Sequence, residues 1–287
     1  MFTTMYPGVS RFLEVWAESV VAQTDTDFDL FVALDGMIPD QAVSACKREQ
    51  VTWLPAPKGV SHTQVRSRAL EYLVDACDAV VFVDPDDVLL PGRVAAAREA
   101  LFGSDITCCA MRLINEQGKD LGRKFDPVGG IDALHRANVF GLTNSSYRTA
   151  ALKSCLPVPD GCILMDWFAA SMAVLKDFKA VVDPTSLMLY RQYGSNTARV
   201  VSPFTEKHVL QAAQLMDGHY DCLSKAVKGD LPGIFNEARE KVRIFLETMR
   251  QNTAVLKTYV KALNSLDCDH VWWSWVAHPL LENIWKH

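Results

Sequence analysis

AVVFVDPDD, residues 79–87, is the stretch that decides the fold of this chain. An apolar run rich in β-branched residues stops at three carboxylates, Asp84, Asp86 and Asp87, which is typical of a strand buried on both faces in a parallel sheet. Pro85 cannot continue a central strand, so the acids should lie just past its carboxyl end, where open α/β sheets bind ligands. Three acids this close repel one another unless a cation or N–H donors neutralise them. The segment therefore predicts either a divalent-metal site for a phosphate ligand or a turn that caps the next helix.

The composition is that of an ordinary globular protein. The chain has 287 residues, of which 49% are hydrophobic and 22% charged, so it can bury more than one small core. A net charge of −5 gives no electrostatic case for binding nucleic acid. The eight cysteines include no C-x-x-C pair, which favours free thiols in a reducing compartment over a zinc site. Neither a signal peptide nor a bilayer-spanning stretch is evident, so we expect a cytoplasmic protein.

Strands and helices alternate up to about residue 199, which favours a mostly parallel central sheet with right-handed crossovers. The expected strands cover residues 2–6, 28–34, 51–54, 79–83, 106–113, 180–182 and 186–191. The expected helices cover residues 11–22, 41–47, 61–77, 93–101 and 166–175, and the polar, Gly-rich segment 115–144 should form loops with short strands. After residue 202 two amphipathic stretches, 206–227 and 235–263, indicate helices without strands. We therefore expect an α/β domain over residues 1–200 and an all-helical C-terminal extension over residues 201–287.

Polar side chains follow other expected elements at the same edge of the sheet. Asp35 and Gly36 end the second strand, where they form either a tight turn or a carboxylate that accepts N–H bonds from a nucleobase. Arg66 and Arg68 lie on the helix that leads into the acids. Helical arginines usually face solvent, and the alternative is a guanidinium that clamps a diphosphate. Arg191 leaves the last strand near these acids, so it would form an ion pair or neutralise a leaving phosphate.

Asp166 and Trp167 begin a helix whose following residues are almost all apolar. An Asp at this position is typical of an N-cap. It is also suited to a general base, because a rigid helix end holds the carboxylate at the rim of a cleft.

Several motifs of other enzyme classes are absent from the chain. It has no G-x-G-x-x-G after the first strand, no G-x-x-x-x-G-K-[ST] and no G-x-S-x-G. Their absence argues against a dinucleotide-dependent enzyme, a P-loop ATPase and an esterase.

Taken together and in order, these segments resemble the family 2 glycosyltransferases of the GT-A fold. Asp84-Pro85-Asp86-Asp87, with Pro91 after it, resembles the family's Asp-x-Asp-Asp motif, and Met165-Asp166-Trp167 is similar to its Glu-Asp-Trp segment. The weaker matches are the opening strand Thr3–Pro7, the strand Phe28–Gly36, the helix Arg66–Leu70, and the ending Tyr190-Arg191 with Asn196. The resemblance covers roughly the first 200 residues.

The resemblance implies inverting transfer of a sugar from a nucleotide diphosphate sugar, with a UDP-sugar first among donors, to a saccharide or lipid-linked acceptor. Asp166 would be the general base. Asp86, supported by Asp87, would bind Mn²⁺ or Mg²⁺, and Asp84 would share this metal and diphosphate site while facing the ribose or donor sugar. Further donor contacts would come from Thr3, Tyr6, Asp35, Arg66 and Arg191.

Two departures from the family pattern support a different class of function. Met165 replaces the usual Glu before the base, and Tyr193 stands where the family often has a His near the metal. The main alternative is therefore a non-catalytic domain that binds a nucleotide sugar or serves as a scaffold. A nucleotidyltransferase is a weaker alternative, because its Gly-rich opening loop with a Lys is absent.

Four tryptophans crowd the end of the chain, at positions 272, 273, 275 and 285. Such a cluster forms a core, an oligomer interface or an interfacial anchor beside a lipid-linked acceptor. The last two interpretations would give a homo-oligomer joined through the C-terminal helices, or a protein peripheral to the inner face of a membrane.

Overall fold

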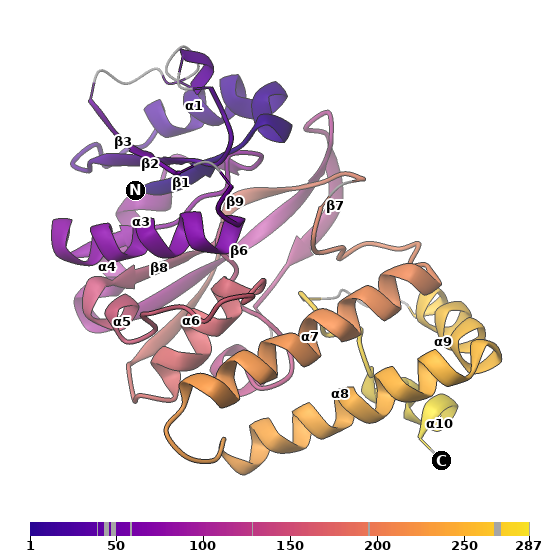
Figure 1. Cartoon of the computed structure of the whole chain (residues 1–287). Helices are drawn as coiled ribbons and strands as arrows, with labels where there is room; N and C mark the ends of the chain where they lie inside the picture. The colour runs from indigo at the N-terminus through magenta and orange to yellow at the C-terminus, as the bar shows by residue number, and fades with distance from the viewer. Residues whose placement is uncertain are drawn as a thin grey trace.

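The computed structural model of the chain describes residues 1–38, 40–42, 46, 50–57, 59–127, 129–194, 196–266 and 271–286. Its N-terminal part is a parallel sheet in the order β1-β2-β3, formed by Phe2–Met5, Leu30–Leu34 and Val51–Pro55 (Figure 1). Every residue of β1 and β2 is buried, as expected for strands covered on both faces.

A second, mixed sheet adjoins the first in the order β4-β8-β6-β9-β5, with β7 paired to β6. Its strands are β4 (Ala79–Val81), β5 (Val88–Leu89), β6 (Ile106–Asn115), β7 (Asp120–Phe125), β8 (Ser145–Arg148) and β9 (Ala180–Gln192). The central pair β6–β9 is parallel, and the other pairs are antiparallel. A parallel bridge between Phe2 and Phe82 joins the two sheets, and the Val83 N–H donates to the Phe2 carbonyl over 3.1 Å. The carboxyl ends of β1, β2 and the 79–83 strand therefore meet at one edge.

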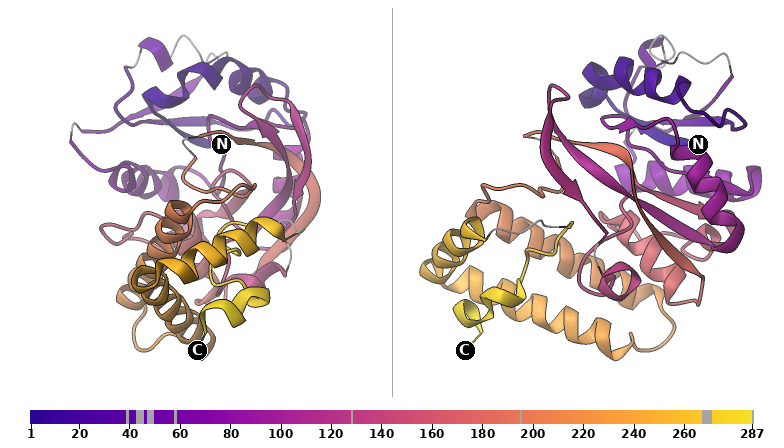
Figure 2. Two further views of the ribbon diagram at one scale, coloured as in Figure 1. Left: turned by 90° about the vertical axis from the view of Figure 1, so that its right-hand side faces the viewer. Right: turned by 180° about the vertical axis from the view of Figure 1, so that it is seen from behind.

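Helices cover both sheets and then form a separate layer. The α/β part carries η1 (Pro7–Phe12), α1 (Leu13–Val21), α3 (His62–Ala76), α4 (Arg93–Gly103), η2 (Gly130–Ala133), α5 (Thr149–Lys153) and α6 (Met165–Val174). The C-terminal layer consists of α7 (Glu206–Ala226), α8 (Gly233–Gln251), α9 (Thr253–Ser265), η3 (Pro279–Leu281) and α10 (Glu282–Trp285). In this layer α7 and α8 run side by side, and α7 also packs against α6 (Figures 1 and 2).

The predicted alternation of strands and helices is confirmed, with two local differences in element boundaries. The strands expected at 180–182 and 186–191 are one strand, β9, whose register shifts between Asp183 and Met188, where the Pro184 nitrogen cannot donate to the ladder. The helix expected over 235–263 is broken at Asn252, whose side chain accepts two N–H bonds and caps α9. Most of the helix expected at 41–47 lies outside the described residues.

The strand expected at 79–83 is shorter, ending as β4 at Val81, and is less completely buried than its apolar sequence predicts. Phe82 and Val83 are buried, whereas Ala79, at the start of the strand, is exposed. The strand β8, which the sequence did not predict, lies between β4 and β6. Its Ser145 and Ser146 are buried although they are polar, so no hydrophobic pattern marked this strand.

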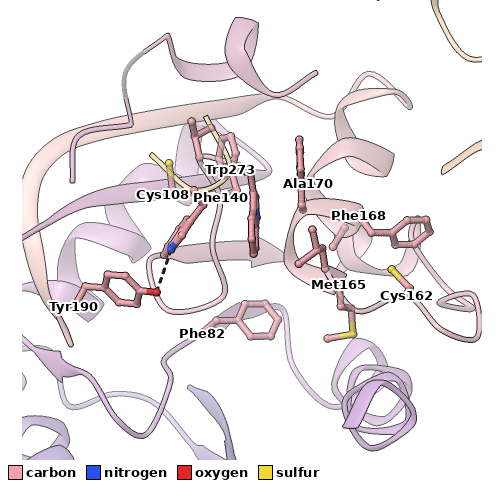
Figure 3. Close-up of a cluster of buried hydrophobic side chains, with 14 of the residues drawn as sticks. Phe82, Cys108, Phe140, Cys162, Met165, Phe168, Ala170, Tyr190 and Trp273 are labelled. Atoms are coloured by element: carbon pink, nitrogen blue, oxygen red, sulfur yellow. Dashed lines mark hydrogen bonds between the residues drawn. The ribbon is translucent and has the colours of Figure 1, made fainter. Parts of the chain in front are cut away.

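The four C-terminal tryptophans are core residues, since none is more than 4% exposed. Trp272 lies directly over Gly141, where a Cβ would come within 1.9 Å of the indole, so glycine is required for this close approach. The Trp272 indole N–H donates to the Tyr190 hydroxyl over 3.1 Å, the bond dashed in Figure 3. Figure 3 also shows Trp273 in the same apolar cluster as Phe82, Met165 and Phe168. The end of the chain therefore packs against the sheet and α6.

Across the described residues, no helix combines the length and the apolar character that crossing a bilayer requires.

Candidate active site

The three acids of the opening motif lie in a turn at the shared carboxyl edge of the strands. The Asp87 N–H donates to the Asp84 carbonyl over 3.2 Å, and the Asp84 N–H donates to the Thr143 hydroxyl over 3.3 Å. Tyr6 follows β1 and Asp35 follows β2 at the same edge. The turn expected from Asp and Pro is thus present, and it gathers the carboxylates.

Arg66, from α3, stands among these acids. Its Nη2 lies 3.7 Å from Asp84 Oδ1, and both side chains are about one quarter exposed. Burial raises the pKa of Asp84 to about 7; the charge of Arg66 opposes this rise, and the charges of Asp86 and Asp166 add to it. The charges of Asp86 and Asp166 both affect the ionisation of Asp84, so the carboxylates of the turn and the carboxylate at the start of α6 belong to one site.

Asp86 accepts a hydrogen bond from one tyrosine, which a second tyrosine contacts in turn. The Tyr193 hydroxyl donates to Asp86 Oδ2 over 2.7 Å, and the hydroxyls of Tyr193 and Tyr6 are themselves hydrogen-bonded. Burial, with the charge of Asp86 next, raises the pKa of Tyr6 to about 12, and burial also raises the pKa of Asp86. Both tyrosines therefore stay protonated at neutral pH and serve as donors beside this carboxylate.

Asp87 and Arg191 are turned into the protein. Asp87 is 1% exposed, and its Oδ1 accepts the Arg191 backbone N–H over 2.7 Å. The Arg191 guanidinium is 4% exposed and donates to the carbonyls of Asp86 (2.7 Å), Asn115 (3.3 Å) and Glu116 (2.8 Å). It also lies over the Phe12 ring at 4.7 Å. These contacts fix the end of β9 against the acid turn and leave the guanidinium little surface for a phosphate.

If Arg191 is such a brace, Arg191→Met should lower the free energy of unfolding by about 2–4 kcal/mol, because several buried carbonyls lose a charged donor. Urea denaturation measures this. The matched control is Arg11→Met. Arg11 also lies over Phe12, but it is 54% exposed and pairs with Glu116 at the surface, so its loss should cost less than about 1 kcal/mol. Equal stability of the two variants would show that Arg191 is not needed for folding and is free to contact a ligand.

Asp166 is the second residue of α6 and is held at both oxygens. Its Oδ2 accepts from the Asn138 amide over 2.9 Å, and its Oδ1 accepts the Trp167 N–H over 2.8 Å. Burial raises the pKa of Asp166, while the Trp167 N–H, Arg66 and Asn138 oppose the rise. The N-cap position itself belongs to Leu164, so the simple N-cap interpretation does not hold. An oriented carboxylate of raised basicity is suited to accept a proton.

The two remaining predicted donor contacts differ in their surroundings. The Asp35 side chain is 13% exposed, and its Oδ2 contacts Nδ1 of His62, which lies at the surface. Thr3 is 1% exposed, and its hydroxyl has no partner among the described residues. Asp35 can therefore reach a ligand at the edge of the sheet, whereas Thr3 offers a ligand almost no surface.

The structure thus brings Tyr6, Arg66, Asp84, Asp86 and Asp166 together in one site. Sequence reasoning missed Asn138, His62 and the hydrogen bond from Tyr193. Asn138 is positioned by its backbone N–H, which donates to the Trp272 carbonyl over 3.1 Å. A contact between such distant parts of the chain leaves no local pattern in the sequence.

The oxygen ligands of this site suit Mg²⁺ or Mn²⁺. Burial raises the pKa of all four carboxyls, those of Asp84, Asp86, Asp87 and Asp166, so a further cation would lower the cost of ionising them. Within the described ranges, no three His, Cys, Asp or Glu side chains are arranged to hold a metal ion. Mg²⁺ is commonly held by one or two carboxylates together with substrate phosphates, so Asp86 and Asp84 fit a metal bound together with a diphosphate.

No protein-family profile and no curated protein sequence matches this chain. Its fold is similar to the mannosyltransferase PcManGT from Pyrobaculum calidifontis in complex with GDP-Man and Mn²⁺, with a TM-score of 0.60 and 14% identity over 98% of this chain and 77% of that one. TarS 1-349 from S. aureus gives a TM-score of 0.55 and 17% identity over 91% and 77%. GalNAc-T7 with UDP, GalNAc and Mn²⁺ gives 0.50 and 12% over 92% and 57%. The α/β fold of GT-A type is confirmed, and at these identities the likeness establishes the fold alone.

Proposed function

We propose that this chain is a glycosyltransferase that transfers a sugar from a nucleoside diphosphate sugar to a hydroxyl acceptor, with inversion at the anomeric carbon. The observation that carries the proposal is Arg66, 3.7 Å from Asp84 Oδ1 in the acid turn, together with the effect of the Asp166 charge on Asp84, which puts a candidate base near a candidate diphosphate site. The fold adds support, because PcManGT has been solved with GDP-Man and Mn²⁺ and GalNAc-T7 with UDP, GalNAc and Mn²⁺.

In the proposed reaction Asp166 takes the proton of the acceptor hydroxyl as its oxygen attacks the anomeric carbon. The bond from that carbon to the diphosphate oxygen breaks, and the electron pair leaves with the diphosphate. Asn138 and the Trp167 N–H keep the carboxylate oriented during this step. Mn²⁺ or Mg²⁺, held by Asp86 and Asp84, would neutralise charge on the leaving diphosphate.

Other residues of the site would hold the donor. Arg66 provides the guanidinium nearest the acids and would contact the phosphates, and Asp35 would accept N–H bonds from the base. Tyr6 and Tyr193 would orient Asp86. For Asp87 and Arg191 we propose a bracing role, because Asp87 accepts the Arg191 backbone N–H and the Arg191 guanidinium donates to the Asp86 carbonyl. Residues 1–200 would then carry the donor site and the base, and residues 201–287 would close the site from the side of α6.

The proposal is tested by the thermal stability of the chain with UDP, GDP, ADP and CDP, each with and without Mn²⁺. We expect one of them, UDP first, to stabilise the protein only with Mn²⁺, by about 2.7 kcal/mol when the ligand is at 100 times its Kd. Uridine with Mn²⁺ and UDP with EDTA are the controls, because uridine lacks the diphosphate and EDTA removes the metal ion. If no nucleoside diphosphate stabilises the chain in the presence of Mn²⁺, the donor-site proposal fails.

The alternative is a non-catalytic nucleotide-sugar-binding domain, favoured by Met165 and Tyr193 at positions where the family pattern differs. Both functions predict the stabilisation just described. To distinguish the two functions, the nucleoside diphosphate sugar that corresponds to the stabilising nucleotide is incubated with Mn²⁺ and candidate acceptors. Only an enzyme would release the nucleoside diphosphate.

A further inference from the structure

Next to Tyr193 lies a cavity of about 670 Å³ that the proposed reaction leaves unassigned. It lies between the segment after β9, the loop before α6, helix α7 and the tryptophan-rich segment that contains Trp273 and Trp275. We call it the Tyr193–His219 pocket, after two residues that line it; others are Ile163, Arg199, Lys207 and Trp273.

The pocket adjoins the proposed chemistry on two sides. At one side Tyr193 donates its hydroxyl hydrogen bond to Asp86. At the other, His219 stacks on Trp167, with ring centroids 4.1 Å apart and planes 11° from parallel. Trp167 directly follows Asp166 along α6, so the wall of the pocket packs against the residue next to the proposed base.

His219 is a buried polar side chain without a partner. It is 2% exposed, it lines the pocket, and neither ring nitrogen has a hydrogen bond to the described residues. Burial lowers the pKa of His219 to about 3, so the ring is neutral and carries one N–H donor and one acceptor. Leaving both unsatisfied costs stability, and a ligand hydroxyl in the pocket would satisfy one of them.

The charge of the pocket is positive. Arg199, Lys207 and His208 line it, and no Asp or Glu is among the described residues of its wall. The pKa of His208 is lowered by partial burial and then by the charges of Arg199 and Lys207, which reports a positive potential at this rim. Such a rim attracts an anion.

We propose that the Tyr193–His219 pocket is the acceptor site, and that the acceptor is an anionic, hydroxylated compound such as a sugar phosphate or a uronate. Its acidic group lies at Arg199 and Lys207, and a hydroxyl contacts His219, whose ring packs on Trp167 next to the proposed base. The assignment to an acceptor rests on the proposed function. The donor is a poorer occupant, because no described lining residue precedes Gly161, and the described ends of β1 and β2, which are expected to bind the nucleoside, contribute nothing to the wall.

The test titrates the full chain with glucose 6-phosphate, glucuronate and glucose by calorimetry, each alone and with UDP and Mn²⁺. We expect both anions to bind at least about tenfold more tightly than glucose, with or without UDP and Mn²⁺. In spectra of histidine-labelled protein, the His219 resonance, assigned by its loss in His219→Phe, should shift on binding.

Two variants and one matched control sharpen the result. Lys207→Glu, at the exposed rim, should weaken binding of glucose 6-phosphate about tenfold. Lys257→Glu, an exposed lysine of α9 outside the pocket wall, should not. His219→Phe keeps the stack on Trp167 and removes the unpartnered nitrogens, so it should raise the melting temperature while it weakens binding of the sugar phosphate.

The proposal is overturned if glucose 6-phosphate binds no more tightly than glucose, if Lys207→Glu and Lys257→Glu are equivalent, or if no probe binds. Competition between UDP with Mn²⁺ and glucose 6-phosphate would assign the pocket to the donor instead, which also overturns it. Its failure is separate from that of the proposed function, because the nucleoside diphosphate panel needs no acceptor. A chain that binds glucose 6-phosphate here and no nucleoside diphosphate would refute the proposed function and leave an anion site without an acceptor role.

Discussion

Replacing Asp166 by asparagine should lower sugar transfer by about 10²–10⁴-fold, the usual contribution of a positioned general base, and should leave donor affinity near that of the parent protein. Asparagine has almost the same shape, and its amide oxygen can still accept from Asn138 or from the Trp167 N–H. What disappears is the ability to take up a proton. The measurements are kcat for transfer and the Kd for nucleoside diphosphate with Mn²⁺.

Asp160→Asn is the matched control, because Asp160 lies exposed in the loop that leads to α6. It should change neither kcat nor donor affinity. A collapse of donor affinity in Asp166→Asn would mean that Asp166 binds the donor or supports the site instead of acting as base. Full transfer by this variant would place the base elsewhere and leave Asp166 as a residue that stabilises the first turn of α6.

The parts of the fold that the sequence predicts are those set by local pattern. The 79–87 segment could be assigned as a strand and an acid turn because its apolar run and its proline act on the adjacent backbone. Asp35 could be placed at the same edge for the same reason, since parallel strands end together. Helix α3 begins where Ser61 and Gln64 form a reciprocal capping box, which sequence alone can suggest.

The parts that the sequence does not predict depend on long-range pairing. Arg191 was expected at the phosphates, but its guanidinium is directed at three backbone carbonyls that only the folded chain assembles. Asn138 meets Asp166 because its backbone pairs with Trp272. The same pairing places Trp272 on Phe125 and Tyr190, a long-range contact that composition could not assign.

Replacing Asp86 by asparagine should abolish Mn²⁺-dependent binding of nucleoside diphosphate, with a loss of affinity of at least about 100-fold, or about 2.7 kcal/mol. The variant keeps an oxygen for the Tyr193 hydroxyl and loses the charge that a divalent cation requires. Calorimetric titration with UDP, or with whichever nucleoside diphosphate stabilises the parent chain, measures the effect with and without Mn²⁺.

The same substitution should leave the ligand-free protein as stable as its parent or slightly more stable. Burial raises the pKa of Asp86, and its charge also raises the pKa of Asp84, so removing this charge relieves an unfavourable pair. Lost binding at unchanged melting temperature would therefore separate a ligand role from a folding role. Asp75→Asn, at an exposed carboxylate of α3 that pairs with Lys153 at 3.5 Å, is the control and should preserve binding. Undiminished Mn²⁺-dependent binding by Asp86→Asn would remove Asp86 from the metal site, and Asp84, which lies in the same turn, would be the carboxylate to replace next.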